Sequence, residues 1–285
     1  MLGPSDLVLC SGTVPRASTF EERLDAATAG GFTAISLWGR DYAAARRAGH
    51  SDADLRARLA DRGLAVAEVD PAWDWTPAPV DRAALATIDD MELFRFGGDE
   101  LLEIGAAVGA RSINAVDILG GDWGVDDAIE SFAALCDRAA EHGLLVQLEF
   151  LPWSKIPDAE RAWEIVHRAD RPNGGIAIDA WHWFRGTPDA AALRAIPGAK
   201  VLGVQLADAP AAAESNAMHA ALHDRRLPGA GELDLVALLA ALREIGAVAP
   251  IGVEVLSDDL HSLGAIEAAR RAGEATRTLL AKVAP

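Results

Sequence analysis

Cysteine is scarce in this sequence: Cys10 and Cys136 are the two that its 285 residues contain. Two cysteines are too few for a disulfide scaffold, and their separation does not match a zinc-binding or redox-active pair. Long apolar runs are also missing, since none approaches the roughly 18 residues that span a bilayer. The short apolar stretch near the N-terminus has no basic segment before it, as a signal peptide would have. These absences predict a cytoplasmic protein without a membrane partner.

Basic residues are few, with 26 Lys and Arg against 43 Asp and Glu, which gives a formal net charge of −17. A field of that sign repels phosphate backbones and anionic lipids, so we expect no nucleic-acid partner. The same acidity helps to concentrate divalent cations, although it also serves solubility. Hydrophobic residues make up 51% of the chain, which is enough for a large buried core.

Short β-branched or aliphatic runs alternate with longer amphipathic runs, and Gly or Pro stands at most of the junctions. This alternation is typical of βα units. A doubly wound open sheet would show the same alternation, but no glycine-rich phosphate-binding motif follows the first strand. We therefore predict an α/β fold, a (β/α)8 TIM barrel in one domain over residues 1–285, although the length alone also permits two domains. The predicted strands are residues 7–10, 33–38, 65–70, 112–118, 145–150, 176–179, 201–206 and 251–255, and the predicted helices are residues 20–29, 52–62, 99–108, 126–142, 158–169, 190–195, 235–245 and 263–282.

Polar residues interrupt four of the predicted strands near their C-terminal ends, where barrel enzymes place their chemistry. They are Glu149, Asp179, Gln205 and Glu254. A carboxylate among Leu, Val and Ile is costly unless a cation or a hydrogen bond compensates it, so any one of them alone could simply pair with a loop backbone. Four on neighbouring strands favour a shared divalent metal ion. Their oxygen atoms suit Mn²⁺ or Mg²⁺ best, with Co²⁺ and Zn²⁺ as alternatives.

Aromatic residues are expected around the same mouth of the barrel. Seven of the eight tryptophans follow predicted strands. We expect Trp38, Trp153 and Trp181 among them to offer flat faces to a substrate. The alternative is that the indoles pack loops onto the barrel rim.

Further polar residues are candidates for the mouth. His182 follows Asp179 by three residues, so it could contact substrate or support a metal ligand. Glu68 could contact substrate or a cation carried by a helix. Asp208 could cap the next segment or orient Gln205. The remaining candidates are Arg40, Asp41, Tyr42 and Asp70.

These strand ends resemble those of the sugar phosphate isomerase/epimerase superfamily, the xylose isomerase-like barrels that include tagatose 3-epimerases, hydroxypyruvate isomerase, and inosose isomerases and dehydratases. The resemblance covers nearly the whole chain and is sharpest over residues 148–255. In that family a Glu, an Asp, a His or Gln, and a Glu from strands five to eight hold the metal. They map onto Glu149, Asp179, Gln205 and Glu254, and the family's Asp-x-x-His runs from Asp179 to His182.

After strand seven the family often carries an Arg followed by Pro-Gly-x-Gly, and residues 225–231 match this pattern. The resemblance implies that Arg225 contacts substrate. Two departures leave the substrate open: Gln205 stands in place of the more common His, and the segment 209–224 is longer than in compact epimerases.

The resemblance implies a metal-dependent isomerase or epimerase that acts on a keto-sugar, a cyclitol or a related hydroxy-carbonyl compound. The metal would chelate a carbonyl and its neighbouring hydroxyl and so acidify the C–H bond between them. Glu149 and Glu254 would act as general base and acid through a cis-enediolate. The same residues allow a dehydratase or lyase that expels a hydroxyl from a keto-cyclitol, a dehydroshikimate-like acid or an oxidised glycoside. The expected partner is a small polyhydroxy or glycoside-like substrate.

A different class of protein, a catalytically silent barrel that binds a ligand or partner, is also compatible with the sequence, because Gln205 suits a weakened metal site. Endonuclease-type barrels, which hold several zinc ions through extra histidines, fit less well. Of the seven histidines, His182 alone lies near a predicted strand end, and the net charge opposes DNA. By analogy with barrels of this kind, we expect that the chain can form homo-oligomers.

Overall fold

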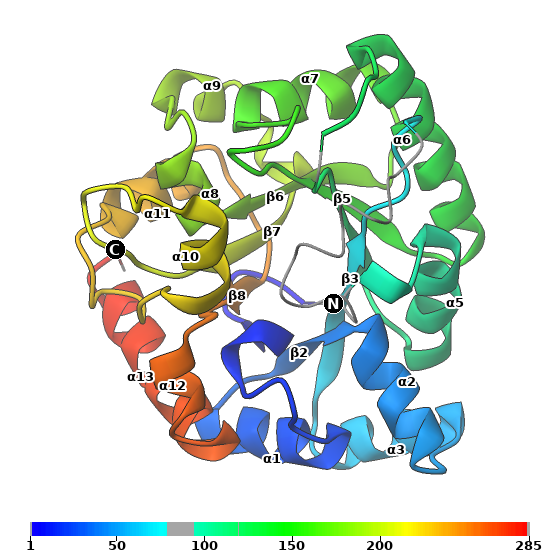
Figure 1. The fold of residues 1–285 in the computed structure, drawn as a ribbon, viewed down its shortest axis with the longest axis vertical. Coiled ribbons are helices and arrows are strands. Elements are labelled where there is room, and N and C mark those ends of the chain that lie inside the picture. Colours follow the sequence, from blue (N-terminus) through cyan, green and yellow to red (C-terminus); the bar gives the residue numbers. More distant parts are fainter. Residues whose placement is uncertain (1, 79–93, 119, 284–285) are drawn as a thin grey trace.

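The computed structural model describes residues 2–78, 94–118 and 120–283. Eight parallel strands follow one another in sequence order and close into a barrel, because β8 pairs with β1. Figure 1 shows the strands at the centre and the helices in a ring around them. The predicted (β/α)8 barrel is therefore confirmed. The strands are β1 (Leu7–Leu9), β2 (Ala34–Trp38), β3 (Ala65–Ala72), β4 (Ser112–Val116), β5 (Leu145–Glu149), β6 (Gly174–Asp179), β7 (Val201–Leu206) and β8 (Ile251–Val253).

Helices cover the outer face of the barrel. The last long helix lies beside the first, so the outer ring closes next to the point where it begins (Figure 1). The α-helices in the described part of the chain are α1 (Phe20–Gly30), α2 (Gly39–Arg47), α3 (Asp52–Asp61), α5 (Gly98–Val108), α6 (Val125–Glu141), α7 (Ala159–Ala169), α8 (Ala180–Arg185), α9 (Ala190–Arg194), α10 (Ala217–His223), α11 (Leu235–Glu244), α12 (Asp258–His261) and α13 (Ala265–Ala281). Short 3-10 helices in the described ranges include η1 (Ser11–Thr13) and η3 (Gly198–Lys200).

Local sequence explains where several helices begin. Thr19 and Ser51 each accept a hydrogen bond from a backbone N–H three residues later, and the carboxylates of Glu22 and Asp54 accept one from the backbone N–H of the cap residue. These are capping boxes, which satisfy two backbone donors that a helix start leaves unpaired. Asp158 caps α7 in a similar way, by accepting from the backbone of Arg161.

The strands are buried on both faces. Every residue of β2, β4, β6 and β7 is buried, as expected for a parallel sheet that has helices outside and side chains inside. β3 continues to Ala72, two residues beyond the prediction, whereas β8 ends at Val253, so that Glu254 lies just past the strand. In the described ranges, no helix combines the length and the apolar character needed to cross a membrane.

Short helices at the mouth were not predicted. Residues 40–42 belong to α2 and residues 181–182 belong to α8, where loops were expected. α10 and α12 were missed as well. A helix of four to seven residues is too short to display an amphipathic repeat, so periodicity in the sequence does not reveal it.

Candidate metal centre

The four strand-end residues predicted to bind metal arrive on adjacent strands. Glu149 and Asp179 are the last residues of β5 and β6, and Gln205 is the penultimate residue of β7. Asp179 and Gln205 are direct neighbours in the β6–β7 register. Glu254 follows β8, and its backbone N–H donates to the Leu206 carbonyl oxygen of β7 at 3.0 Å. All four side chains are buried, so their polar atoms need partners inside the protein.

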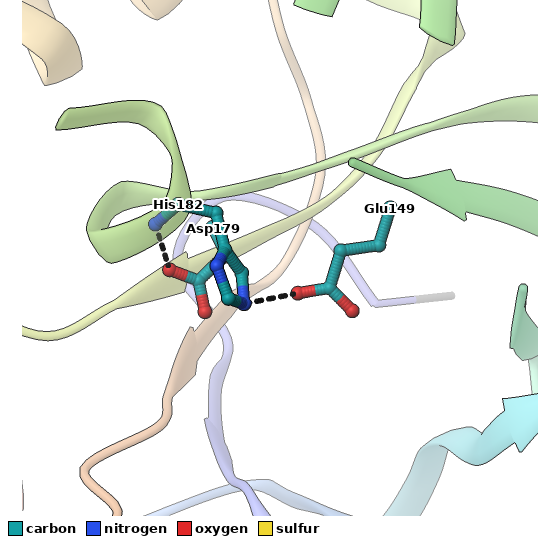
Figure 2. Close-up of side chains that lie close together, drawn as sticks. All are labelled: Glu149, Asp179 and His182. Carbon is teal, nitrogen blue, oxygen red and sulfur yellow. Dashed lines mark hydrogen bonds and ion pairs between the residues drawn. The ribbon is translucent and has the colours of Figure 1, made fainter. Parts of the chain in front are cut away.

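Glu149, Asp179 and His182 form a cluster whose ligand atoms all lie within 4.8 Å of one another. His182 Nε2 lies 3.6 Å from Glu149 Oε1, and Figure 2 shows the Glu149 carboxylate pointing toward that edge of the imidazole. Asp179 Oδ1 accepts hydrogen bonds from the backbone N–H groups of Trp181 (2.6 Å) and His182 (3.1 Å), and so caps α8. This cap brings His182 back over the strand end. The sequence predicted His182 as a substrate contact or a support for a ligand, and the structure brings its ring nitrogen within 4.8 Å of carboxylate oxygens of Glu149 and Asp179, in a group that could hold a metal ion.

Arg225 connects Glu254 to this cluster. Its Nη1 donates to Asp179 Oδ2 at 2.7 Å and to Glu254 Oε2 at 3.2 Å. Its Nε donates to the Ala221 carbonyl oxygen at 2.7 Å, and its Nη2 lies 3.4 Å from His182 Nε2. The guanidinium is buried, and it places a positive charge between two carboxylates. The predicted residue Arg225 therefore lies inside the site.

Gln205 and Glu68 meet one level deeper in the barrel. Gln205 Nε2 donates to Glu68 Oε1 at 3.0 Å, and Gln147 Nε2 donates to Glu68 Oε2. Glu68 also lines a small cavity together with Ser112, the first residue of β4, and Arg111, which precedes that strand. The carboxylate expected to contact substrate is thus bound by two amides inside the barrel. Gln205 Oε1 is buried and has no hydrogen-bond partner among the residues that the structure describes.

Asn114 is a functional candidate that the sequence analysis missed. It lies on β4 and is buried, and its Nδ2 donates to Glu149 Oε2 at 2.5 Å. This bond holds one carboxylate oxygen of Glu149 while the other lies near His182. Asn114 and Gln147 both interrupt apolar strands, in the segments Ser-Ile-Asn-Ala-Val and Leu-Val-Gln-Leu-Glu. A polar residue within an apolar strand was therefore visible in the sequence at both positions. Gln147 lies two residues before Glu149 on the same strand.

Burial and mutual repulsion change the proton affinities of the cluster. Burial, assisted by the charge of Asp179, raises the pKa of Glu149 from its ordinary 4.5 to about 8. Burial also raises the pKa of Glu254 well above its usual range. For Asp179 burial acts in the same direction, but Arg225 and His182 outweigh it, so its pKa is lowered. Burial lowers the pKa of His182 to about 4, and its imidazole is therefore neutral at pH 7.

The donor atoms at this site fit a divalent cation. Carboxylate oxygens, a neutral imidazole nitrogen and an amide oxygen are ligands that Mn²⁺, Mg²⁺ and Zn²⁺ take in proteins. A buried carboxylate whose proton is hard to remove, such as Glu149, gains from a nearby cation. Gln205 Oε1 is a buried acceptor without a donor, which is costly unless a cation or a ligand approaches it.

The three predicted tryptophans pack closely around the site. Trp181 is fully buried, and its ring makes edge contacts with His182 at 5.3 Å and Trp153 at 6.3 Å between centroids. Trp153 is half-buried and also contacts His182, at 5.5 Å. Trp38 is buried, and its Nε1 donates to Asp70 Oδ2 at 2.9 Å. These contacts favour the packing alternative for Trp38 and Trp181, and a substrate contact through Trp153 stays a prediction.

Asp208 organises the loop that follows β7. Its Oδ1 accepts from the backbone N–H groups of Ala209 (2.8 Å) and Leu233 (3.1 Å), and its Oδ2 accepts from Gly229 N at 2.9 Å. Its backbone pairs with Arg226 in an isolated bridge. Asp208 therefore ties the backbone of residues 229 and 233 to the end of β7, which is neither the capping of the next segment nor the orientation of Gln205 that the sequence left open.

Comparisons with known proteins agree with this architecture. A family model described as "xylose isomerase-like TIM barrel" matches residues 24–280. The 3-dehydroshikimate dehydratase of Pseudomonas putida is 29% identical over 276 residues, which are 94% of this chain and 40% of that protein. The inosose isomerase of Bacillus subtilis is 29% identical over 157 residues, which are 54% of this chain and 55% of that protein. The chain thus spans about two fifths to just over half of the length of these curated relatives.

A solved structure shows the same fold. The crystal structure of IolI protein with a bound zinc atom superposes with a TM-score of 0.83, at 21% identity, over 98% of this chain and 99% of that one. At this identity the likeness concerns the fold alone, because one fold can carry many different chemistries.

Proposed function

The chain belongs to the family of xylose isomerase-like TIM barrels, and from that premise we propose that it is a divalent-metal-dependent enzyme. In this proposal it removes the proton beside the carbonyl of a small, hydroxyl-rich substrate. The observation on which the proposal depends most is the buried cluster of Glu149, Asp179 and His182, with ligand atoms within 4.8 Å of one another at the C-terminal end of the barrel. This is the end where enzymes of this architecture place their active sites.

The proposed ligands are Glu149, Asp179, Gln205 and Glu254, and we propose His182 as a further donor, which its place in the buried cluster supports. Mn²⁺ and Mg²⁺ are the ions that we expect, because most of the donors are oxygen atoms. Zn²⁺ is the alternative, which the imidazole and the zinc in the IolI structure support. When bound, the ion would supply Lewis-acid polarisation of a substrate carbonyl.

The protein's own groups would move protons and hold the substrate. Glu149 and Glu254 are the proposed general base and acid, because both are buried carboxyl groups at the cluster. Arg225 would donate a hydrogen bond from Nη2 to a substrate oxygen while Nη1 stays on Asp179. Trp153 and Trp181 pack against His182 and would keep water away from the site.

Two outcomes of proton removal are open to this site. In a dehydration, a carboxylate takes the proton from the carbon beside the carbonyl, and the hydroxyl on the next carbon leaves with a proton as water. In an isomerisation or epimerisation, the proton returns to a neighbouring carbon or to the other face of the same carbon. We favour dehydration, because the dehydratase relative matches 94% of this chain and the isomerase relative 54%.

A proton NMR assay in D₂O tests both outcomes. The protein is loaded with Mn²⁺, which is removed with a chelator before spectra are recorded, and is offered 3-dehydroshikimate and an inosose in parallel. Dehydration produces new signals from protons on unsaturated carbons, whereas isomerisation or epimerisation exchanges a carbon-bound proton without loss of water. Protein kept in chelator throughout is the control and should leave both compounds unchanged. If the protein takes up no divalent ion in equilibrium dialysis, the proposal of a metal-dependent enzyme is wrong.

A further inference from the structure

A layer of polar side chains lies inside the barrel beneath the candidate metal centre. Glu68, Gln147 and Gln205 come from β3, β5 and β7, which are alternate strands, and alternate strands contribute to the same layer of a barrel interior. All three are buried. Each carboxylate oxygen of Glu68 accepts from a different amide, Oε1 from Gln205 and Oε2 from Gln147. Both glutamine amides are thereby turned with their nitrogen toward Glu68.

The orientation of the Gln205 amide matters for a cation site. An amide group has an oxygen that can bind a cation and an NH₂ group that cannot. Because Nε2 of Gln205 is held by Glu68 at 3.0 Å, Oε1 is the end left for another partner, and in the described part of the chain this buried oxygen has none. A histidine carries a nitrogen atom at two positions of its ring, so it would not depend in this way on which end faces the cation. The glutamine at this position therefore depends on a neighbour that selects its oxygen.

Gln147 fixes the position of Glu68 from the side opposite Gln205. Gln147 holds Oε2, and the Gln147 amide lies against Gly203 of β7. A Cβ at residue 203 would lie 2.7 Å from Gln147 Oε1, so the absence of a side chain there makes room for the amide. The chain of contacts runs from Gly203 through Gln147 and Glu68 to Gln205.

We propose that Glu68 is a positioning residue that turns the amide of Gln205 so that Oε1 faces the divalent cation of the proposed function. The inference rests on that proposed function, and it replaces the predicted substrate contact of Glu68. Glu68 acts through Gln205 and touches neither the cation nor the substrate. The role follows from the hydrogen bonds of the two glutamines and from the unpartnered oxygen.

Titration calorimetry with Mn²⁺ alone tests the proposal without any assay of activity. The affinities of the wild type, Glu68→Gln, Gln205→Ala and the double variant are measured at one pH. Replacement of a group that orients a metal ligand commonly costs about tenfold to a hundredfold in affinity, and we expect a loss of that size for Glu68→Gln. In the double variant we expect the affinity of Gln205→Ala alone, because without the amide there is nothing left to orient.

Two further variants separate geometry from charge. Glu68→Asp keeps the carboxylate but withdraws it by one methylene group, so it should also weaken Mn²⁺ binding. Asp70→Asn is the matched control: Asp70 is a buried carboxylate on the same strand whose partner is Trp38, and its loss should change the affinity far less than Glu68→Gln does. Circular dichroism of the metal-free variants checks that each one is folded.

The outcomes distinguish this inference from the proposed function. Wild-type protein that does not bind Mn²⁺ contradicts the function and this role together. Tight binding by the wild type and equally tight binding by Glu68→Gln or Glu68→Asp would overturn the role of Glu68 alone. Losses that simply add in the double variant, or an equal loss in Asp70→Asn, would also overturn it, since they would indicate a general effect of charge or packing.

Discussion

Glu149 and Glu254 are buried carboxyl groups that β5 and β8 bring to the site from opposite sides of the β6–β7 pair. Replacement by glutamine keeps the volume of each side chain but removes its ability to take a proton. We predict that Glu149→Gln and Glu254→Gln each lower kcat of the Mn²⁺-loaded protein by about 10²- to 10⁴-fold. Circular dichroism should show an intact fold. Turnover at the wild-type rate in either variant would remove the two-base mechanism.

The Nη2 group of Arg225 can donate a hydrogen bond to a substrate. Its Nε and Nη1 are bound to Ala221 O, Asp179 and Glu254, whereas Nη2 lies 3.4 Å from His182 Nε2 and carries two hydrogens. We predict that Arg225→Ala raises KM by about tenfold to a hundredfold, as expected for loss of a hydrogen bond from a charged group.

The neighbouring exposed Arg226 supplies the matched control for that measurement. Arg226→Ala removes the same charge from the adjacent position, outside the cluster, and should leave KM near the wild-type value. A normal KM in Arg225→Ala would contradict a substrate contact by Arg225.

Single residues differ in how far the sequence reveals them. The positions of Glu149, Asp179, Gln205 and Glu254 could be predicted, because a polar residue in an apolar strand is visible in the sequence. The place of His182 among the ligand atoms could not, because it depends on the turn that Asp179 caps. Glu68 was visible too, but the direction of its carboxylate depends on amides from β5 and β7 that are distant in the chain.

The loop between β7 and α11 depends on Gly231. A Cβ at this residue would lie 2.2 Å from Asp208 Oδ1 and 2.4 Å from the Ala209 carbonyl oxygen, so neither neighbour leaves room for a side chain. We predict that Gly231→Ala lowers the free energy of unfolding by about 1–3 kcal/mol, the usual cost of forcing atoms into a packed site. Urea denaturation measures this difference.

Gly3→Ala is the control for the same experiment, because its Cβ would meet nothing closer than the Val248 carbonyl oxygen at 3.9 Å. It should leave the free energy of unfolding nearly unchanged. If Gly231→Ala were as stable as the wild type, the loop would have to be able to move away from Asp208, and the role of that carboxylate in holding the loop would lose its support.

Whole elements were predicted with uneven success, for physical reasons. Strands and long helices repeat a pattern over enough residues for their type to be read from the sequence. α2 was missed because its cap residue is Trp38, whose side chain gives no capping hydrogen bond, so the Ser, Thr, Asp or Asn that usually marks a helix start is not there. α8 was missed because it has six residues and begins directly after β6, so no turn residues separate the helix from the strand.

The closure of the barrel is what makes distant segments of the chain neighbours. Strand order follows sequence order, so β5 to β8 form one continuous arc of the wall, and residues from 149 to 254 meet at its rim. That arrangement could be predicted from the alternation of strands and helices together with the lack of a glycine-rich phosphate-binding motif after the first strand. The layer of Glu68, Gln147 and Gln205 adds contacts across the interior, which no pattern along one strand contains.

Metal binding should stabilise the whole molecule more as the pH rises. The pKa of Glu149 is about 8 in the folded metal-free protein against 4.5 ordinarily, so the fold binds this proton more tightly than the unfolded chain does. Stability of the metal-free protein therefore falls as pH rises between those values, by up to about 1.4 kcal/mol per pH unit for this group. A bound cation requires the ionised carboxylate, so cation binding offsets this loss of stability.

We predict that the increase in Tm caused by Mn²⁺ is larger at pH 7.5 than at pH 6, and that Glu149→Gln, which cannot titrate, shows a weaker dependence on pH. An increase in Tm that stays equal or shrinks between the two pH values would contradict a cation that binds at Glu149.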